Sequence, residues 1–370
     1  MNSKTLKYYA WVTILLLFVI GYSSSAMAKT IRWKMGSCWS SSNALIDADR
    51  YFVKTVNELA AGKLKIKLFT VGEIVPAFGL FDAVRDGTLQ AGGDWPGYWA
   101  GKDTAFSTLC GFPMLPRQID YITWIYKGGG FEMYNEIYGK YGLVYFPYFI
   151  ESAESGVRSN KRYAKLDDFK GSKIRMGGKL QSEALVELGA IPVSITGEEV
   201  YQALEKKMID GAEFNLPYMD WQLGYQYVTT EQSAPAWQQP STVMGVCINK
   251  KAWEKLPKDL QAVIKYSAQA TVTWCIAHSS MESGKAQEQF LKRGVRVTYL
   301  DDAALDKIEK ICRKNILEEA KKNPLFAKSI FSFFKTIQQV APYRDLERPL
   351  LKRSVRFSES EMSELEKLGK

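Results

Sequence analysis

The stretch 171–224 constrains the fold of this chain more than any other, because strand and helix patterns alternate along it. In order, it predicts a strand at 173–176, a helix at 181–188, a short strand around Val193, a helix at 198–206 and a strand at 211–214. Glycines at the turns favour a parallel sheet with helical crossovers, so the expected fold class is α/β. Ligands of such sheets bind at the carboxyl ends of the strands. Arg175 and Glu213 fall at those ends.

Three segments of this stretch resemble a known family. They read GSKIRMGG, LGAIPVSITGEEVYQALEKKMIDGAEF and PYMDWQLG, and they are similar to the solute-binding proteins of TRAP transporters, in the branch for monocarboxylic 2-oxo acids such as pyruvate. GEIVPAFGLFDAVRDGTLQAG near residue 80, GKD at 101–103, GGG at 128–130 and FP at 146–147 follow the family's order. The resemblance implies a two-lobed periplasmic binding protein fold with crossing hinge strands and a long spine helix.

The start of the chain is typical of a secretory signal peptide. Lys4 and Lys7 precede an apolar run at 10–20, and Ala26-Met27-Ala28 supplies small residues for cleavage after Ala28. The run is shorter than the roughly 20 apolar residues that a bilayer span needs. An uncleaved N-terminal anchor is the alternative. We therefore expect residues 1–28 to be removed and the mature chain to lie in the periplasm.

A chain of 370 residues exceeds the usual size of one domain. Strand patterns at 142–150 and 241–249 are expected to cross between two lobes, and a long helical pattern runs on to about residue 292. The expected division is lobe I at 29–150 and 244–288, lobe II at 151–243 and 289–340, and a C-terminal helical tail at 341–370.

Composition excludes several classes of function. The formal charge of +9 becomes +7 once the two lysines of the signal peptide are removed, and the basic residues are dispersed along the sequence. Without a basic and aromatic stripe, we expect no nucleic-acid partner. His278 is the only histidine and no G-x-S-x-G is present, so we expect no enzyme. The five cysteines are far apart, which favours buried thiols, although export permits one disulfide.

Arg175 stands where the resemblance places the arginine that binds the substrate carboxylate. A guanidinium presents a planar fork that matches a carboxylate, and it stays charged at any working pH. Tyr98 aligns with a tyrosine of the family's binding cleft, and Trp237, in PAWQQP, stands at a tryptophan of a loop beside it. Both are therefore expected to contact the ligand, with packing as the alternative for each.

The resemblance also implies a metal ion that bridges to the substrate. It assigns Glu213 as a ligand, together with the backbone carbonyl of Phe214, and its metal-binding glutamine falls on Glu154. Two carboxylates favour Ca²⁺, whereas the glutamine accompanies Na⁺ in the family, so either ion is expected. In the alternative, Glu154 pairs with Arg158 and no metal binds.

Arg158 keeps the substrate class open, because a second arginine in the site suits a dicarboxylate or a larger anion. By resemblance, the partners are a small organic acid such as pyruvate or lactate and the TRAP membrane permease. Some members of the branch form homodimers through C-terminal helices, which is an alternative to packing of these helices on their own body. A periplasmic sensor subunit is the competing function.

Overall fold

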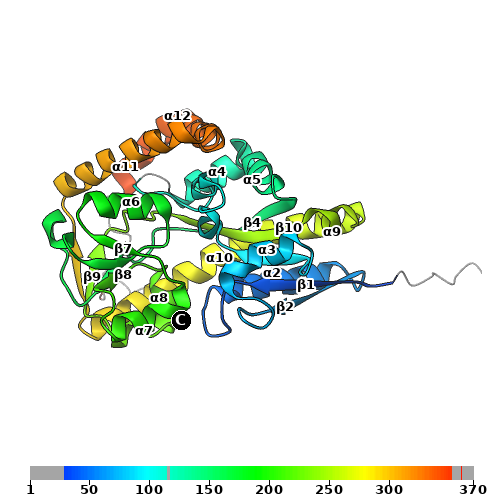
Figure 1. Cartoon of the computed structure of the whole chain (residues 1–370), viewed down its shortest axis with the longest axis horizontal. Coiled ribbons are helices and arrows are strands. Elements are labelled where there is room, and N and C mark those ends of the chain that lie inside the picture. Colours follow the sequence, from blue (N-terminus) through cyan, green and yellow to red (C-terminus); the bar gives the residue numbers. More distant parts are fainter. Residues whose placement is uncertain (1–28, 115–116, 352–359, 361–370) are drawn as a thin grey trace, which may run out of the picture. The chain divides into compact units, whose positions relative to one another are not determined.

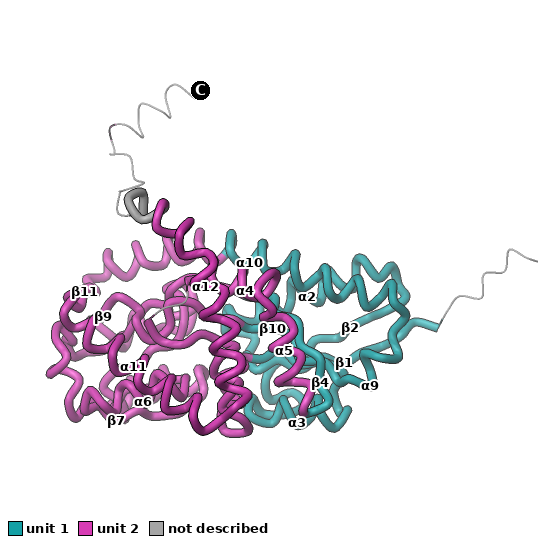
Figure 2. The backbone as a smooth tube through the Cα atoms, turned by 90° about the horizontal axis from the view of Figure 1, so that it is seen from above, with its two compact units in different colours: residues 1–94, 141–149, 244–278 teal, residues 95–140, 150–243, 279–370 magenta. Residues whose placement is uncertain are grey.

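The computed structural model describes residues 29–114, 117–351 and 360. The chain folds into two compact units, coloured separately in Figure 2. Unit 1 comprises Met1–Asp94, Tyr141–Phe149 and Met244–His278, and unit 2 comprises Trp95–Lys140, Ile150–Val243 and Ser279–Lys370. The predicted signal peptide lies outside the described residues. Among the residues described, no helix has both the length and the apolar composition needed to cross a membrane.

Unit 1 is built on a five-stranded sheet with the order β2-β1-β3-β10-β4. Its strands are β1 (Ile31–Ser37), β2 (Leu64–Phe69), β3 (Ala91–Asp94), β4 (Leu143–Glu151) and β10 (Thr242–Asn249). Strand β1 pairs in parallel with β2 and β3, and β10 is antiparallel to β3. Strands β4 and β10 carry the chain between the units, as expected for crossing strands.

Helices of unit 1 pack against this sheet. Helix α2 (Ile46–Leu59) buries Ile46, Phe52, Val53 and Val56, a spacing that places them on one face. Among the described residues, the other α-helices of unit 1 are α3 (Leu80–Arg85), α9 (Lys250–Glu254) and α10 (Lys258–Lys292), labelled in Figure 1. Helix α10 is the predicted long helix, and it contributes residues to both units.

Unit 2 contains a six-stranded sheet with the order β11-β9-β5-β8-β6-β7. Its strands are β5 (Val157–Ser159), β6 (Lys173–Arg175), β7 (Ile191–Val193), β8 (Gly211–Ala212), β9 (Glu231–Ala234) and β11 (Arg296–Tyr299). Strand β6 lies parallel to β7 and to β8, which confirms the parallel module predicted from the stretch 171–224. Strand β8 is shorter than predicted and ends just before Glu213.

Seven α-helices of the described chain belong to unit 2. They are α4 (Gln118–Lys127), α5 (Gly130–Gly139), α6 (Lys179–Glu187), α7 (Val200–Glu205), α8 (Pro217–Gln222), α11 (Asp302–Lys322) and α12 (Pro324–Leu351). Helix α11 packs against both α6 and α12. An apolar core joins these helices to the sheet through residues such as Ile174, Leu185 and Ile308.

Two features differ from the expected division into lobes. Residues 95–140, expected in the first lobe, are part of unit 2 because α4 and α5 pack against α12. Helix α12 also continues through residue 341, where a separate tail was expected to begin. All five cysteines are buried thiols, as expected.

Candidate functional site

Arg175 and Glu213 lie side by side at the carboxyl ends of β6 and β8, where the alternation of strands and helices predicts a site. The register pairs Arg175 with Ala212, so Glu213 follows directly beyond the paired residues. The Nη1 of Arg175 donates to Oε1 of Glu213 and to its backbone oxygen, each at 2.8 Å. The backbone N–H of Gly177 donates to the same Oε1 at 2.5 Å. Arg175 and Glu213 are each only 3% exposed, so water screens this pair little.

Glu154 brings a second buried carboxyl group to Glu213. It is 7% exposed, and its backbone N–H donates to the carbonyl of Gln239 at 3.2 Å. Burial raises the pKa of Glu154 well above its ordinary value, and the adjacent carboxyl of Glu213 raises it further, while Arg175 acts in the opposite direction. Its Oε2 has no hydrogen-bond partner among the described residues. Two touching carboxyl groups cannot both stay ionised without a proton or a cation between them.

The charge on Arg175 is secured by its surroundings. Burial is the largest effect and acts to lower the pKa of Arg175, but Glu213, Tyr98, Tyr225 and Glu154 together outweigh it, so the pKa of Arg175 is raised overall. The Nε of Arg175 also donates to the carbonyl of Ile195 at 3.3 Å. The guanidinium is therefore held in place by contacts that leave its charge intact.

Aromatic rings lie beside this polar group. Cζ of Arg175 lies 5.6 Å from the centre of the Phe214 ring, which is 7% exposed. Tyr98, in the 3₁₀ turn Pro96–Trp99, is half-buried and close enough to Arg175 to interact with its charge. The Tyr98 ring packs edge-on against Trp95, with centroids 5.3 Å apart. Five predicted site residues thus come together: Arg175, Glu213, Glu154, Phe214 and Tyr98.

Arg158 pairs with Asp220 rather than with Glu154. Its Nε donates to Oδ2 of Asp220 at 2.5 Å, and its Nη2 donates to Oγ of Ser155 at 3.2 Å. Its Cζ lies 3.6 Å from the centre of the Phe290 ring. Burial lowers the pKa of Arg158, and the charge of Asp220 opposes this. The fully buried Arg158 therefore pairs with Asp220, which corrects the alternative of a pair with Glu154.

Trp237 packs in the apolar core of unit 2. It is 3% exposed and belongs to the apolar cluster that contains Ile174 and Met176. Its backbone carbonyl accepts a hydrogen bond from Met114 at 2.8 Å. The indole ring packs the interior because the surrounding helices and sheet enclose it.

Sequence reasoning missed Tyr225. Its ring is fully buried, packs edge-on against Phe214 with centroids 6.4 Å apart, and lies near both Arg175 and Glu213. Burial raises its pKa well above the usual value, so the phenol keeps its proton. The hydroxyl has no hydrogen-bond partner within the described chain. Nothing in the local sequence GYQYV distinguishes Tyr225 from Tyr227, which is 65% exposed.

Hydrogen bonds of two glutamines lead to the backbone of Glu154. Nε2 of Gln181 donates to Oε1 of Gln239 at 3.3 Å, and Nε2 of Gln239 donates to Oγ1 of Thr242 at 2.7 Å. Because the carbonyl of Gln239 accepts from the N–H of Glu154, this chain of bonds positions the Glu154 backbone. Gln239 therefore helps to position Glu154 and has no assigned contact with the ligand.

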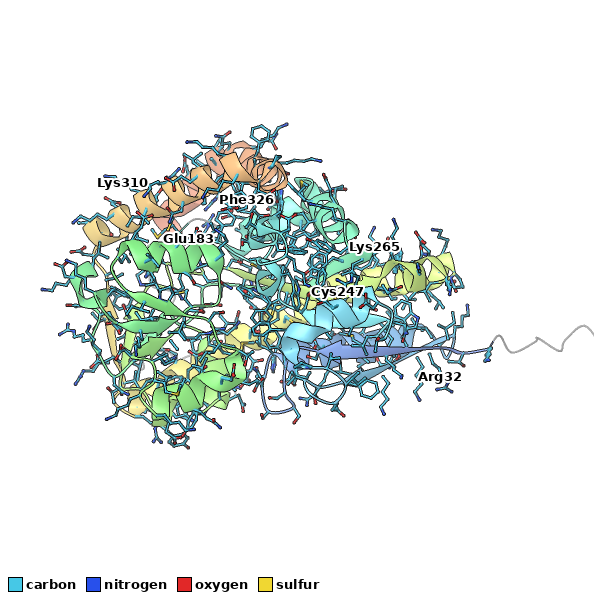
Figure 3. The ribbon with its side chains drawn as sticks, viewed as in Figure 1. Arg32, Glu183, Cys247, Lys265, Lys310 and Phe326 are labelled. Carbon is cyan, nitrogen blue, oxygen red and sulfur yellow. The ribbon has the colours of Figure 1, made fainter. Side chains whose placement is uncertain are left out.

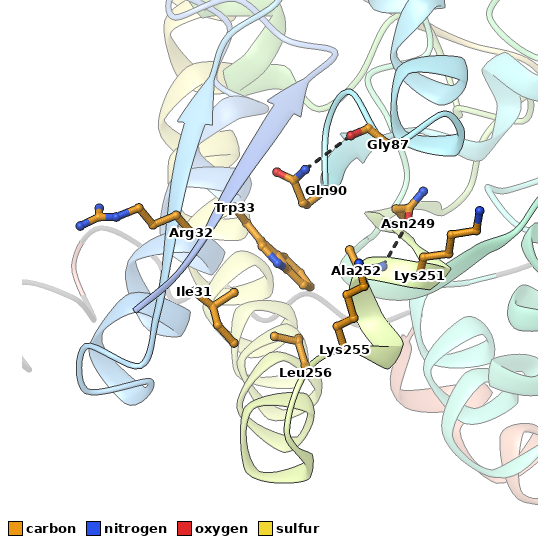
Figure 4. Close-up of a pocket in the computed structure, with 10 residues that line it drawn as sticks. All are labelled: Ile31, Arg32, Trp33, Gly87, Gln90, Asn249, Lys251, Ala252, Lys255 and Leu256. Carbon is orange, nitrogen blue, oxygen red and sulfur yellow. Dashed lines mark hydrogen bonds between the residues drawn. The ribbon is translucent and has the colours of Figure 1, made fainter. Parts of the chain in front are cut away.

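A cavity of about 500 Å³ in unit 1 is lined by other residues, shown in Figure 4. Its two amide side chains are already engaged. Oε1 of Gln90 accepts from the N–H of Lys34 at 2.9 Å, and Nδ2 of Asn249 donates to the carbonyls of Val84 and Arg85. These amides are thus not available to orient a ligand, and the cluster around Arg175 is the better candidate.

Comparison with known proteins finds solute-binding proteins as relatives. The family model described as bacterial extracellular solute-binding protein, family 7, matches residues 35–323. The monocarboxylate 2-oxoacid-binding periplasmic protein of Nostoc sp. is 28% identical over 318 residues, which are 86% of this chain and 86% of that protein.

Two solved structures of TRAP periplasmic solute-binding proteins each match with a TM-score of 0.83. One, from Pseudoalteromonas atlantica with bound sodium and pyruvate, is 27% identical and covers 88% of this chain and 100% of its own. The other, from Colwellia psychrerythraea with bound calcium and pyruvate, is 28% identical and covers 87% of this chain and 99% of its own.

Proposed function

Because the chain belongs to family 7 of the bacterial extracellular solute-binding proteins, we propose that it captures a small carboxylate in the periplasm and delivers it to the membrane permease of a TRAP transporter. The family consists of receptors, so no bond is made or broken. The observation that carries the proposal is the buried group of Arg175, Glu213 and Glu154 at the carboxyl ends of β6 and β8. Burying charged groups costs free energy unless each charge is paired and hydrogen-bonded.

The ligand class that fits best is a 2-oxo or 2-hydroxy monocarboxylate such as pyruvate or lactate. The relatives from Nostoc, Pseudoalteromonas and Colwellia support it by what they bind. In this chain, Arg175 supplies a guanidinium for the carboxylate, and Phe214, Tyr98 and Tyr225 supply apolar walls around it. The pairing of Arg158 with Asp220 favours a monocarboxylate over a dicarboxylate.

The residues present fit a bridging calcium or sodium ion. Glu154 and Glu213 offer hard oxygen atoms, Oε2 of Glu154 has no partner in the described chain, and the two carboxyl groups need a positive charge between them. We propose that Glu154, Glu213 and the carbonyl of Phe214 hold the ion. Once bound, the ion supplies positive charge that can bridge to the ligand's oxygen atoms.

The test is calorimetric titration of pyruvate into mature protein freed of metal with a chelator, with calcium, with sodium and without either. Binding that requires calcium supports a two-carboxylate cation site, and binding that requires sodium supports the same site with the other ion. Pyruvate binding without either ion would refute the metal assignment and leave the ligand class in place. Failure to bind pyruvate and lactate under every condition would refute the ligand class.

We also propose that the protein forms a homodimer through α12. Phe331, Tyr343 and Leu346 of this helix are 69%, 66% and 75% exposed, which is unusual for three large apolar side chains on one helix. Sedimentation velocity should show a dimer that Phe331→Glu weakens and that Lys165→Glu, an exposed control outside α12, leaves intact. A monomer at all concentrations would overturn this proposal without affecting the ligand assignment.

A further inference from the structure

The outer face of strands β1 and β2 carries four basic side chains and no acidic one. Arg32 and Lys34 alternate with the buried Trp33 and Met35 along β1, and Lys65 and Lys67 alternate along β2 in the same way. All four basic residues are exposed. Figure 3 labels Arg32, whose side chain points outward from the ribbon. We call these four residues the basic face.

The register of the sheet places like charges directly beside each other. Arg32 is opposite Lys65, and Lys34 is opposite Lys67. Neighbouring strands are about 4.8 Å apart, and residues two apart on a strand are separated by roughly 6.6 Å. The four charges therefore form a compact grid, although the basic residues are dispersed along the sequence. Like charges directly opposite each other on a sheet destabilise the pairing.

The protein does not neutralise this repulsion. Within the described chain, no ion pair involves any of the four residues, whereas the adjacent Lys63 pairs with Asp259 at 3.0 Å. Lys67 lies 4.6 Å from the centre of the Phe69 ring and near Glu73. The carboxylate of Glu73, however, is engaged by the N–H and hydroxyl of Thr70. A partner with negative charge would relieve the repulsion.

Protection of the sheet edge explains only half of the basic face. Lysines on an edge strand discourage pairing with other chains, and β2 is the edge strand of this sheet. Strand β1 is not an edge, because it pairs with β2 on one side and with β3 on the other. Edge protection therefore does not explain the exposed positive charges of Arg32 and Lys34.

We propose that the basic face binds an anionic membrane surface through the phosphate groups of its lipids. The four side chains are long, exposed and spread over one face of a sheet, so they do not converge on a single small anion. Figure 4 shows the Arg32 side chain directed away from the neighbouring cavity. A plane of repeated phosphates matches such a grid, and each basic residue near an anionic membrane contributes to attraction that salt screens.

The experiment measures sedimentation of mature protein with vesicles of phosphatidylglycerol and phosphatidylcholine, and with vesicles of phosphatidylcholine alone. We expect binding to the anionic vesicles only, and we expect it to weaken as salt rises from about 0.01 M to about 0.15 M. The variant with Arg32, Lys34, Lys65 and Lys67 all changed to Gln should bind roughly a thousandfold more weakly. A matched control changes four exposed lysines elsewhere to Gln: Lys165, Lys206, Lys265 and Lys310.

Two outcomes would overturn the proposal. One is equal binding to both kinds of vesicle, and the other is an equal loss in the two fourfold variants. Salt-sensitive binding of the basic face to polyglutamate but not to vesicles would also overturn it and would point to an acidic protein. The melting temperature of the basic-face variant should not fall, because the repulsion is removed. Its unchanged titration by pyruvate keeps this test separate from the proposed function.

Discussion

At the scale of single residues, the site is a problem of charge balance. Arg175 supplies one buried positive charge, whereas Glu213 and Glu154 supply two carboxyl groups that touch. With no further partner, one of the two acids must keep a proton. Burial favours Glu154 as that acid, because it raises the pKa of Glu154. A cation removes the need for that proton, which explains how metal and ligand can depend on each other.

Arg175→Ala should weaken pyruvate binding at least thirtyfold, since loss of one partner of a buried charge pair costs about 2–5 kcal/mol. The substitution removes the guanidinium that we propose binds the carboxylate, and it leaves Glu213 without the hydrogen bonds from Arg175. Calorimetry measures the change, with the exposed Arg313→Ala as the control. Equal affinities for Arg175→Ala and the wild type would remove Arg175 from the binding site.

Glu154→Gln should reduce the rise in melting temperature that calcium produces. The amide carries no negative charge, so the site loses attraction for a divalent ion, and the metal-free protein no longer needs a proton between Glu154 and Glu213. We therefore expect the variant to be more stable than the wild type without metal and less responsive to calcium. An unaltered calcium response would show that the ion binds elsewhere.

At the scale of elements, short strands of unit 2 depend on close backbone contact. Gly156 precedes β5 with φ of +86°, and a Cβ at this position would lie 2.0 Å from the backbone oxygen of Ser233. Strand β5 pairs with β9 at Ser233, and β5 carries Arg158 to Asp220. A side chain at Gly156 would therefore disturb the pairing that sets the elements behind the site.

Gly156→Ala should lower stability by more than about 2 kcal/mol, because a backbone atom cannot move aside as a flexible side chain can. Gly171→Ala is the matched control in unit 2, with φ of +70° and no atom within 4 Å of the added Cβ. The control should lose only about 1 kcal/mol for its backbone conformation. Thermal unfolding followed by circular dichroism compares the two, and similar losses would contradict the predicted steric clash.

At the scale of the whole molecule, each unit buries a carboxyl group whose pKa is raised. In unit 1, burial raises the pKa of Asp49 to about 7, although hydrogen bonds from Ser37 and Tyr148 oppose the shift. In unit 2, burial raises the pKa of Glu151 to about 8, and its hydrogen bond with Ser279 acts against this. The folded protein thus holds two protons that the unfolded chain releases at a lower pH.

Stability should fall as pH rises from about 4 to about 8. The unfolded chain loses these two protons near pH 4, whereas the folded chain keeps them until pH 7 to 8. Their contribution is complete below the unfolded pKa values and disappears once pH exceeds the folded ones. The variant Asp49→Asn/Glu151→Gln should show a flatter dependence of melting temperature on pH, compared with the exposed control Glu58→Gln. An equally steep dependence in the double variant would assign the effect to other groups.

The sequence determined the features that depend on local pattern. The helical pattern that runs to about residue 292 located α10, and the alternation of strands and helices placed Arg175 and Glu213 at neighbouring strand ends. These follow because the period of a helix or strand, and the edge at which parallel strands end, are properties of nearby residues.

Only the tertiary structure decided which distant residues meet. Arg158 pairs with Asp220, which is 62 positions away in the sequence. Trp237 is part of the core because elements far apart in sequence enclose it. Tyr225 joined the site, and the register of β1 with β2 gathered the four charges of the basic face, without a local signal for either. The sequence gives the charge and size of each side chain. Its contacts depend on how the whole chain packs.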